Sequence, residues 1–335
     1  MPEPDAAPGA PLLEARGLEK AFRVPRAASG GTRLHALAGV DLAVRRGRTL
    51  GLVGESGCGK STLARVLLML ERPDAGTVRF DGVDPFALRG RRLLAWRRRV
   101  QMVFQDPFAS LNPRLTAADL IAEPWLTHRD LVPRARRRER VAALLDMVGL
   151  RAGDADKYPQ EFSGGQRQRI GIARALALEP ELIVCDEPVS ALDLSVQAQV
   201  LNLLTDLQDR LGVAYVFISH DLSVVRHVAD EVAVMYLGKV VESGGADEVF
   251  GTPRHPYTAS LLSAAPSLAA VRQAERRERI VLTGEVPSPV DPPSGCRFRT
   301  RCWQAAEVCA TTEPAPAGDG HLAACHFPLA PAARR

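Results

Sequence analysis

The chain has 335 residues, more than the ~100–200 of one ordinary domain, which predicts one large domain with an addition. Its hydrophobic content of 46%, charged content of 24% and formal net charge of +4 are those of an ordinary globular protein. No apolar run approaches the ~20 residues that span a bilayer, and no basic, then apolar, leader begins the chain. We therefore expect a cytosolic protein that reaches membranes only through partners, and its six cysteines are not expected to form disulfides there.

The first predicted elements are a short lead and two strands. Residues 1–11 are rich in Pro and Ala, and we expect them to be disordered. Strands are predicted from Leu12 to Val24 and from Leu34 to Arg48. Phe22, near the end of the first strand, could pack in the core or stack on a nucleobase, and the residues alone leave both alternatives open.

A glycine-rich segment, residues 54–61, lies between the apolar run Thr49–Val53 and a helix-compatible run. Strand, glycine loop and helix are the context in which G-x-x-x-x-G-K-[ST] predicts a phosphate-binding loop. Its glycines let backbone N–H groups face phosphate oxygens, and the new helix adds its positive end. We expect Lys60 to reach the β- and γ-phosphates and Ser61 to place its hydroxyl on Mg²⁺. The nucleotide-binding candidates in this segment are Gly54, Glu55, Ser56, Gly57, Cys58, Gly59, Lys60, Ser61 and Thr62.

Two further strands are predicted, over residues 76–82 and 100–104. The second ends at Gln105-Asp106-Pro107. Ligands of α/β sheets are bound at the carboxyl ends of the strands, which makes Gln105 a candidate, although a lone Gln is more often structural.

Residues 110–160 have helical periodicity, interrupted by Pro124 and Pro133 and ended by Gly149. We expect a helical subdomain over about residues 106–178, inserted into the α/β core. Its predicted core positions are Leu120, Ile121, Val141, Leu144, Leu145 and Val148.

Arginines cluster at Arg89–Arg99 and Arg134–Arg140, a composition that would suit nucleic acid or anionic lipid. Because no aromatic stacking pattern accompanies them, we favour solvated helix faces.

Ser163-Gly164-Gly165-Gln166, the signature segment, precedes a helix predicted over Ile170–Ala177. Ser163 suits a helix N-cap, and the glycines would let an anion approach exposed N–H groups closely. The next apolar strand ends at Asp186-Glu187. The first acid suits a Mg²⁺ site through its ordered water, and the second suits the orientation of an attacking water.

Two more polar residues follow downstream. Asp193 closes a loop into a helix predicted over Val196–Leu211. The buried strand Ala214–Ile218 ends at Ser219-His220-Asp221. A histidine at a strand tip is often only a satisfied core residue, but here it ends the third strand in a row that finishes in polar groups.

After a hairpin predicted over residues 231–242, the composition beyond about residue 266 shifts to Pro, Arg and Cys, which indicates a C-terminal extension over 266–335. This segment has too few apolar residues to build much core, so its cysteines are either unrelated thiols or ligands of a metal. Four thiolates suit Zn²⁺ or an iron–sulfur cluster. The gaps of five, six and fifteen residues weaken zinc, which usually shows tight C-x₂₋₄-C pairs. The candidate ligands are Cys296, Cys302, Cys309 and Cys325; Cys58 and Cys185 are not expected to be ligands.

Together these motifs resemble the nucleotide-binding subunit of an ABC transporter over almost the whole chain. The specific marker is the signature segment between a phosphate loop and an Asp-Glu strand, with Phe162 where Leu is usual. Arg254-His255-Pro256-Tyr257-Thr258, Gly284-Glu285-Val286-Pro287-Ser288-Pro289 and the cysteine-bearing tail are similar to ATPase subunits of dipeptide/oligopeptide and nickel importers. Within that group the chain looks most like the second dipeptide ATPase subunit.

The resemblance implies an α/β P-loop NTPase (RecA-like) ABC nucleotide-binding domain over residues 12–265, with an antiparallel β subdomain. Two such subunits close head to tail around two ATPs, each touching one phosphate loop and the partner's signature segment. Glu187 would then be the general base or the residue that orients the attacking water, and His220 would contact the γ-phosphate. Asp193 would link the two sites, and Phe22 would stack on adenine. The resemblance assigns Mg²⁺ to Ser61, Gln105 and Asp186.

The resemblance also implies partners: a non-identical sister ATPase, two membrane permeases and an extracytoplasmic binding protein, with no nucleic acid. The chain would lie peripherally at the cytoplasmic face of the plasma (inner) membrane and power dipeptide or oligopeptide import. The resemblance also favours a [4Fe–4S] cluster in the tail. We expect this cluster to have a structural role, because the tail is distant in sequence from every ATP-site motif. Import of nickel or another small solute is the alternative. A soluble ABC ATPase acting on nucleic acid fits less well, since the chain has one cassette and no sustained heptads.

Overall fold

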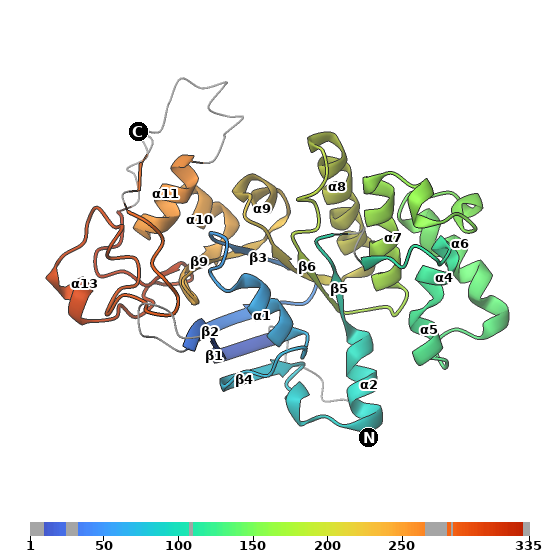
Figure 1. Cartoon of the computed structure of the whole chain (residues 1–335), viewed down its shortest axis with the longest axis horizontal. Coiled ribbons are helices and arrows are strands. Elements are labelled where there is room, and N and C mark those ends of the chain that lie inside the picture. Colours follow the sequence, from blue (N-terminus) through green and yellow to red (C-terminus); the bar gives the residue numbers. More distant parts are fainter. Residues whose placement is uncertain (1–9, 25–32, 107–109, 265–279, 283, 331–335) are drawn as a thin grey trace. The chain divides into compact units, whose positions relative to one another are not determined.

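The computed structural model describes residues 10–24, 33–106, 110–264, 280–282 and 284–330 (Figure 1). Most of the predicted lead lies outside these residues. The chain divides into two compact units. The first comprises residues 1–45, 49–86 and 218–335, and the second comprises residues 46–48 and 87–217.

The first unit contains a three-stranded antiparallel sheet in which β1 (Leu13–Arg23) lies between β2 (Arg33–Val44) and β4 (Ala75–Phe80). Leu13, Ala15 and Leu18 of the central strand are buried. This is the predicted antiparallel β subdomain.

A second set of strands in the same unit is built on β3 (Thr49–Val53), all of whose residues are buried. It pairs in parallel with β8 (Glu231–Tyr236), and β8 pairs antiparallel with β9 (Lys239–Gly245). This confirms the predicted hairpin. The C-terminal extension joins these strands directly, because β10 (Leu322–Ala323) pairs with β9.

Helices of the first unit follow its strands closely. A Cβ atom added at Gly51 in β3 would lie 2.3 Å from the side chain of Val225, which belongs to helix α9 (Leu222–Val228). Only glycine at this position therefore allows α9 to pack so closely against β3. The helices are α1 (Lys60–Leu67), α9 (Leu222–Val228), α10 (Ala246–Gly251), α11 (Pro256–Ala264) and α13 (Glu307–Thr311), and the short η1 spans Pro85–Ala87.

In the second unit, β5 (Val100–Val103) pairs in parallel with β6 (Leu182–Asp186), which has β7 (Ala214–Ile218) on its other side. Leu182 to Cys185 are all buried, as expected of a parallel strand covered on both faces. The longer helices of this unit are α2 (Gly90–Arg99), α7 (Gly164–Leu176) and α8 (Leu194–Leu211).

Short helices between β5 and α7 form the predicted helical region, and Figure 1 shows them gathered together. All six predicted core residues there are buried, none more than 3% exposed. The fully buried Trp125 donates from Nε1 to the carbonyl of Ala177 at 2.8 Å. Pro124 begins a helix, Pro133 precedes another, and Gly149 with φ +72° follows the end of α6. These helices are α4 (Ala117–Ala122), α5 (Pro124–Thr127), α6 (Arg137–Met147), η2 (Arg134–Arg136), η3 (Ala152–Asp154) and η4 (Pro159–Glu161).

The arginine clusters lie mostly on exposed faces of these helices and pair with acids. Arg98 contacts Asp130 at 3.2 Å, and Arg140 contacts Glu179 at 2.6 Å. This agrees with solvated helix faces. Within the described residues, no helix combines the length and the apolar character needed to traverse a bilayer.

Candidate functional site

The phosphate loop, residues 54–61, connects β3 to α1 as predicted. Gly54, Gly57 and Gly59 have φ values of +151°, +79° and +112°. A Cβ at Gly54 would lie 2.2 Å from the carbonyl oxygen of Met235, and one at Gly59 would lie 2.3 Å from that of Ala36. Both the backbone conformation and the lack of space therefore require glycine at these two positions.

The ammonium group of Lys60 is directed back onto the loop. Its Nζ donates to the carbonyl of Gly54 at 2.6 Å and to that of Glu55 at 3.0 Å. Ser56, Gly57 and Ser61 are exposed on the same loop. A glycine loop that brings backbone N–H groups, a helix start and a lysine together is chemically suited to a polyphosphate.

The cysteines predicted not to bind metal lie in closed surroundings. Cys58 in the loop and Cys185 in β6 are both buried, and burial raises the pKa of each thiol. Reactive or ligating cysteines need an accessible thiolate, so both positions suit packing.

Gln105 and Glu187 are brought together in the second unit. Val103 at the end of β5 is paired with Cys185 of β6, so the residues two positions beyond each lie side by side. Nε2 of Gln105 donates to Oε2 of Glu187 at 2.9 Å. Glu187 has φ +47°, a left-handed conformation that glutamate rarely adopts and that is concentrated at functional sites. Asp186, the last residue of β6, is half-buried.

The signature segment is the start of α7 itself. Ser163 is the N-cap of this helix, as predicted, so α7 begins at Gly164, and the predicted range that starts at Ile170 was too short. Ser163 Oγ accepts from the Gln166 amide at 3.3 Å, and Gln166 Oε1 accepts from the Ser163 amide at 3.0 Å. This capping box, whose serine contributes about 1 kcal/mol, overrides the poor helix propensity of two glycines.

The two signature glycines have different surroundings. A Cβ at Gly165 would lie 2.3 Å from the side chain of Val196, whereas one at Gly164 would meet only Leu192 Cδ2 at 3.3 Å. Close packing within this chain therefore explains why residue 165 is glycine, whereas such packing only weakly restricts residue 164.

Asp193 is the N-cap of α8, which accordingly begins at Leu194 and not at the predicted Val196. Its Oδ1 accepts from the Val196 amide at 3.0 Å and from Ser195 Oγ at 2.7 Å. These hydrogen bonds lower the pKa of the Asp193 carboxyl.

Two candidates lie outside the loop in the first unit. Phe22 is half-buried on β1, with the Lys20 ammonium 5.4 Å from its ring centroid. His220 is exposed, and the next residue, Asp221, caps α9 by accepting from the Ser223 amide at 2.8 Å. The first unit thus holds the phosphate loop, Phe22 and His220, and the second holds the remaining ATP-site candidates.

The tail cysteines share a pocket, which we call the cysteine pocket, with an empty volume of about 290 Å³ that includes open solvent. Burial raises the pKa of Cys296 and Cys302, and that of Cys325 to about 11. Among the residues that the structure describes, no group of three or more His, Cys, Asp or Glu side chains is arranged to hold a metal ion. The lining includes Cys296, Cys302, Cys309, Cys325, His255 and Phe298.

Distance along the sequence does not separate the tail from the phosphate loop in space. The tail is distant in sequence from the ATP-site motifs, but Arg301, next to Cys302, pairs with Glu55 of the phosphate loop at 2.7 and 3.1 Å. The Glu55 amide also donates to the hydroxyl of Tyr257 at 2.9 Å. The sequence identified Tyr257 only as part of a family motif, and it gave no signal for Arg301.

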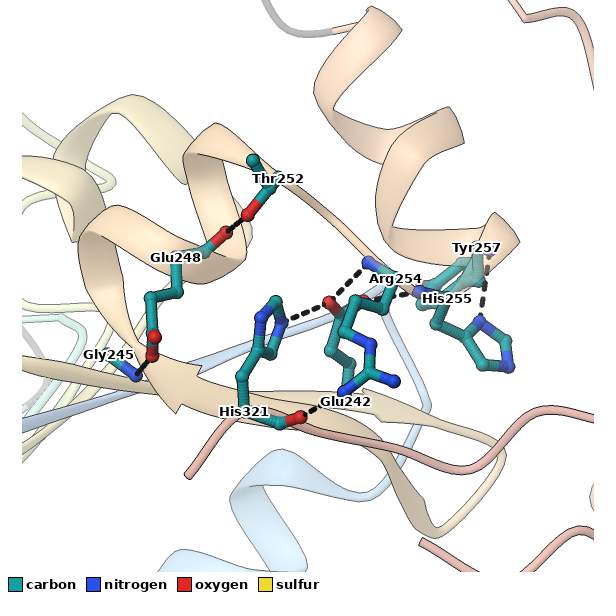
Figure 2. Close-up of polar contacts among 8 residues, drawn as sticks. All are labelled: Glu242, Gly245, Glu248, Thr252, Arg254, His255, Tyr257 and His321. Carbon is teal, nitrogen blue, oxygen red and sulfur yellow. Dashed lines mark hydrogen bonds and ion pairs between the residues drawn. The ribbon is translucent and has the colours of Figure 1, made fainter. Parts of the chain in front are cut away.

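A buried carboxylate fixes the segment that carries Tyr257 (Figure 2). Glu242 on β9 accepts from the amides of Arg254 and His255 at 2.7 and 2.9 Å and contacts His321 Nε2 at 2.7 Å. Arg254 Nη1 donates to the carbonyl of His321 at 2.7 Å. The family motif at residues 254–258 is therefore fastened to both the sheet and the tail.

Comparisons with known proteins agree with this geometry. A family model described as ABC transporter matches residues 37–190, and one described as Oligopeptide/dipeptide transporter, C-terminal region, matches residues 241–309. The dipeptide transport ATP-binding protein DppF of Haemophilus influenzae is 51% identical over 318 residues, 94% of this chain and 96% of that protein. The oligopeptide transport ATP-binding protein AppF of Bacillus subtilis is 53% identical over 295 residues, 87% of this chain and 89% of that protein.

The dimeric structure of the ATP-binding cassette MJ0796 bound to ADP and Pi is 30% identical, with a TM-score of 0.62, and covers 70% of this chain and 98% of that chain. The mixed α/β fold, the phosphate loop and the capped signature helix define an ABC-type P-loop ATPase, as predicted. The chain belongs to the ABC transporter ATP-binding proteins, in the dipeptide and oligopeptide transport family. Proteins of this class bind ATP and Mg²⁺ in general.

Proposed function

We propose that this chain is the ATP-binding and hydrolysing subunit that powers import of dipeptides or oligopeptides through a membrane ABC transporter. The observation that carries the proposal is the sequence identity of about 50% to dipeptide and oligopeptide transport ATP-binding proteins over most of the chain. The match over residues 241–309, which includes the 254–258 motif and three of the tail cysteines, supports the peptide branch. We propose domain boundaries of 12–265 for the cassette, with its helical subdomain over about 106–178, and 266–335 for the extension.

The proposed complex pairs this chain with a sister ATPase, two permeases and an extracytoplasmic binding protein. The chain then lies peripherally at the cytoplasmic face of the plasma membrane. The dimeric structure of the similar cassette MJ0796 supports a pair of ATPase subunits.

The proposed nucleotide contacts begin with the phosphate loop. Its backbone N–H groups and Lys60 bind the phosphates, and Phe22 stacks on adenine. Mg²⁺, which would neutralise charge on the phosphates, is assigned to oxygens of Ser61, Gln105 and Asp186. The donor set fits, because hydroxyl, amide and carboxylate oxygens are the ligands that Mg²⁺ prefers.

Hydrolysis is assigned to Glu187, which accepts a proton from the attacking water, with His220 contacting the γ-phosphate. The hydrogen bond from Gln105 and the left-handed backbone support a fixed orientation of this carboxylate. The signature segment, Ser163 to Gln166, serves the partner's ATP, and Asp193 links the two sites.

The experiment that tests this function is dipeptide uptake by vesicles that contain the co-expressed complex. The chain should co-purify with membranes only when permease and sister genes are also expressed. A strong preference for Ni²⁺ over dipeptides would redirect the proposal to nickel import, and nucleic-acid-stimulated turnover without permeases would favour a soluble ATPase.

We propose further that Cys296, Cys302, Cys309 and Cys325 hold a [4Fe–4S] cluster, with Zn²⁺ as the alternative. Two observations support a shared site: the four thiols line one pocket, and they come from separate positions along the tail, where Cys309 lies on α13 and the other three lie outside helices and strands. The donor set is all thiol, which suits an iron–sulfur cluster.

Anaerobically purified protein should be brown and contain about four iron atoms per chain with matching sulfide. Cys302→Ser should remove the colour and most of the iron, since one of four ligands is lost. Cys185→Ala, at a buried thiol outside the pocket, should leave both unchanged. Colourless protein with one zinc per chain would contradict the iron assignment, and metal-free protein would contradict the site.

A further inference from the structure

We infer that Arg301 and Tyr257 are positioning residues of the phosphate loop, and that through them the cysteine pocket controls nucleotide affinity. They hold Glu55 from two directions, by its carboxylate and by its backbone amide. The inference rests on the proposed nucleotide binding by this loop, but Arg301 and Tyr257 lie outside every ATP-site motif.

The ion pair between Arg301 and Glu55 is bidentate and largely shielded from solvent. Nη1 of Arg301 lies 2.7 Å from Oε2 of Glu55, and Nη2 lies 3.1 Å from Oε1. The side chains are 8% and 27% exposed. Two parallel charge-assisted bonds fix direction as well as distance, unlike a single contact between exposed side chains.

Tyr257 ties the loop backbone to an aromatic cluster beside the cysteine pocket. Its ring centroid is 4.7 Å from that of Tyr236 and 5.3 Å from that of Phe298. Phe298 is buried and lines the cysteine pocket. Displacement of Phe298 would therefore shift the Tyr257 ring, and with it the hydroxyl that accepts a hydrogen bond from the Glu55 amide.

The position of Tyr257 is itself fixed by the Glu242 network (Figure 2). Nδ1 of His255 accepts from the Tyr257 amide at 3.1 Å, and the amide of His255 donates to Glu242. His255 lies in the wall of the cysteine pocket, and burial lowers its pKa to about 3, so it remains neutral. Contacts thus run without a break from the pocket wall to the phosphate loop.

Glu55 is well placed to transmit this control. Lys60 donates to the carbonyls of Gly54 and Glu55, so a shift of Glu55 alters the lysine that contacts phosphate. Arg301 immediately precedes Cys302, which lines the pocket, so a change that moves Cys302 also moves the guanidinium. A loop held in its binding conformation loses less entropy when nucleotide binds, which raises affinity.

The first test measures binding of a fluorescent ATP analogue to the full-length chain. Arg301→Met should weaken binding about tenfold, since a charge-assisted, partly buried contact is lost. Arg301→Lys keeps the positive charge but cannot make both hydrogen bonds of the guanidinium group, so its affinity should lie between that of wild type and that of Arg301→Met. Arg45→Met removes another Arg–Glu pair of the same unit, at 2.8 Å from Glu231, and should bind like wild type.

The second test is a double-mutant cycle. Glu55→Gln should weaken binding about as much as Arg301→Met, and the double variant should lose no more than either, because both remove one interaction. Cys302→Ser should weaken binding in the wild-type background but add nothing in Glu55→Gln. Amide exchange at Glu55 should accelerate in Tyr257→Phe and Arg301→Met, with the unfolding temperature measured in parallel.

Unchanged affinity and exchange in Arg301→Met would overturn the inference, as would additive losses in the cycle. A loss in Cys302→Ser that persists fully in Glu55→Gln would overturn the link to the cysteine pocket. Wild-type chain that binds no nucleotide would contradict the ATPase function and this inference together, whereas wild-type binding with insensitive variants contradicts the inference alone.

Discussion

Glu187→Gln is expected to lower ATP turnover of the assembled complex by about 100-fold or more while ATP binding stays near wild type, since positioned bases contribute at least that factor. The amide oxygen of glutamine can still accept the hydrogen bond that Gln105 donates at 2.9 Å, so geometry is kept and basicity is lost. An ATP-bound dimer with the sister subunit should accumulate. Turnover by phosphate release and dimer mass by gel filtration measure the two effects.

The matched control for this variant is Glu179→Gln. Glu179 is another glutamate with a left-handed backbone, φ +55°, in the same unit, and its exposed carboxylate pairs with Arg140. It should retain turnover. Near-normal turnover in Glu187→Gln would remove Glu187 from the role of base.

Gly164→Asp is expected to abolish turnover of the complex without changing ATP affinity of the isolated chain. A carboxylate about 4 Å from a phosphate charge costs of the order of 4 kcal/mol at an effective dielectric constant of about 20, roughly a thousandfold. The variant should fold, because a Cβ at this position meets only Leu192 Cδ2 at 3.3 Å. Binding to the isolated chain, dimer formation and turnover are the three measurements.

Gly165→Ala supplies the comparison that separates packing from function. The added Cβ would lie 2.3 Å from the Val196 side chain, so Gly165→Ala should lower the unfolding temperature. Gly164→Ala should leave the unfolding temperature nearly unchanged. A large loss of ATP affinity in the isolated Gly164→Asp chain would mean that the signature segment serves the ATP site of its own chain.

Much of this architecture could be predicted because its causes are local. Alternating and continuous apolar runs identified the strands, prolines marked the breaks between α4, α5 and α6, and a glycine marked the end of α6. Even the pairing of Gln105 with Glu187 follows from a simple rule, since residues just beyond adjacent parallel strands share one edge. The N-cap at Ser163 could be predicted from its residue type, but the predicted helix range began only at Ile170, because two glycines suggest a loop until the reciprocal bonds of Ser163 and Gln166 are seen.

The contacts around Glu55 could not be predicted from sequence. Tyr257 and Arg301 lie 202 and 246 residues away along the chain. No periodicity connects such positions, and a partly buried ion pair depends on how the tail folds over β9. Buried Glu242 gave no signal either, because its partners are two backbone amides and a distant histidine.

Dipeptide uptake tests the central claim most directly. Vesicles containing this chain, its sister ATPase and the permeases would enclose ATP and be exposed to binding protein with labelled dipeptide outside. We expect labelled dipeptide to accumulate inside in an ATP-dependent manner, and to fail to accumulate when the chain carries Glu187→Gln. ATP hydrolysis without accumulation of any peptide, in vesicles whose permeases are intact, would contradict the assignment as a peptide importer subunit.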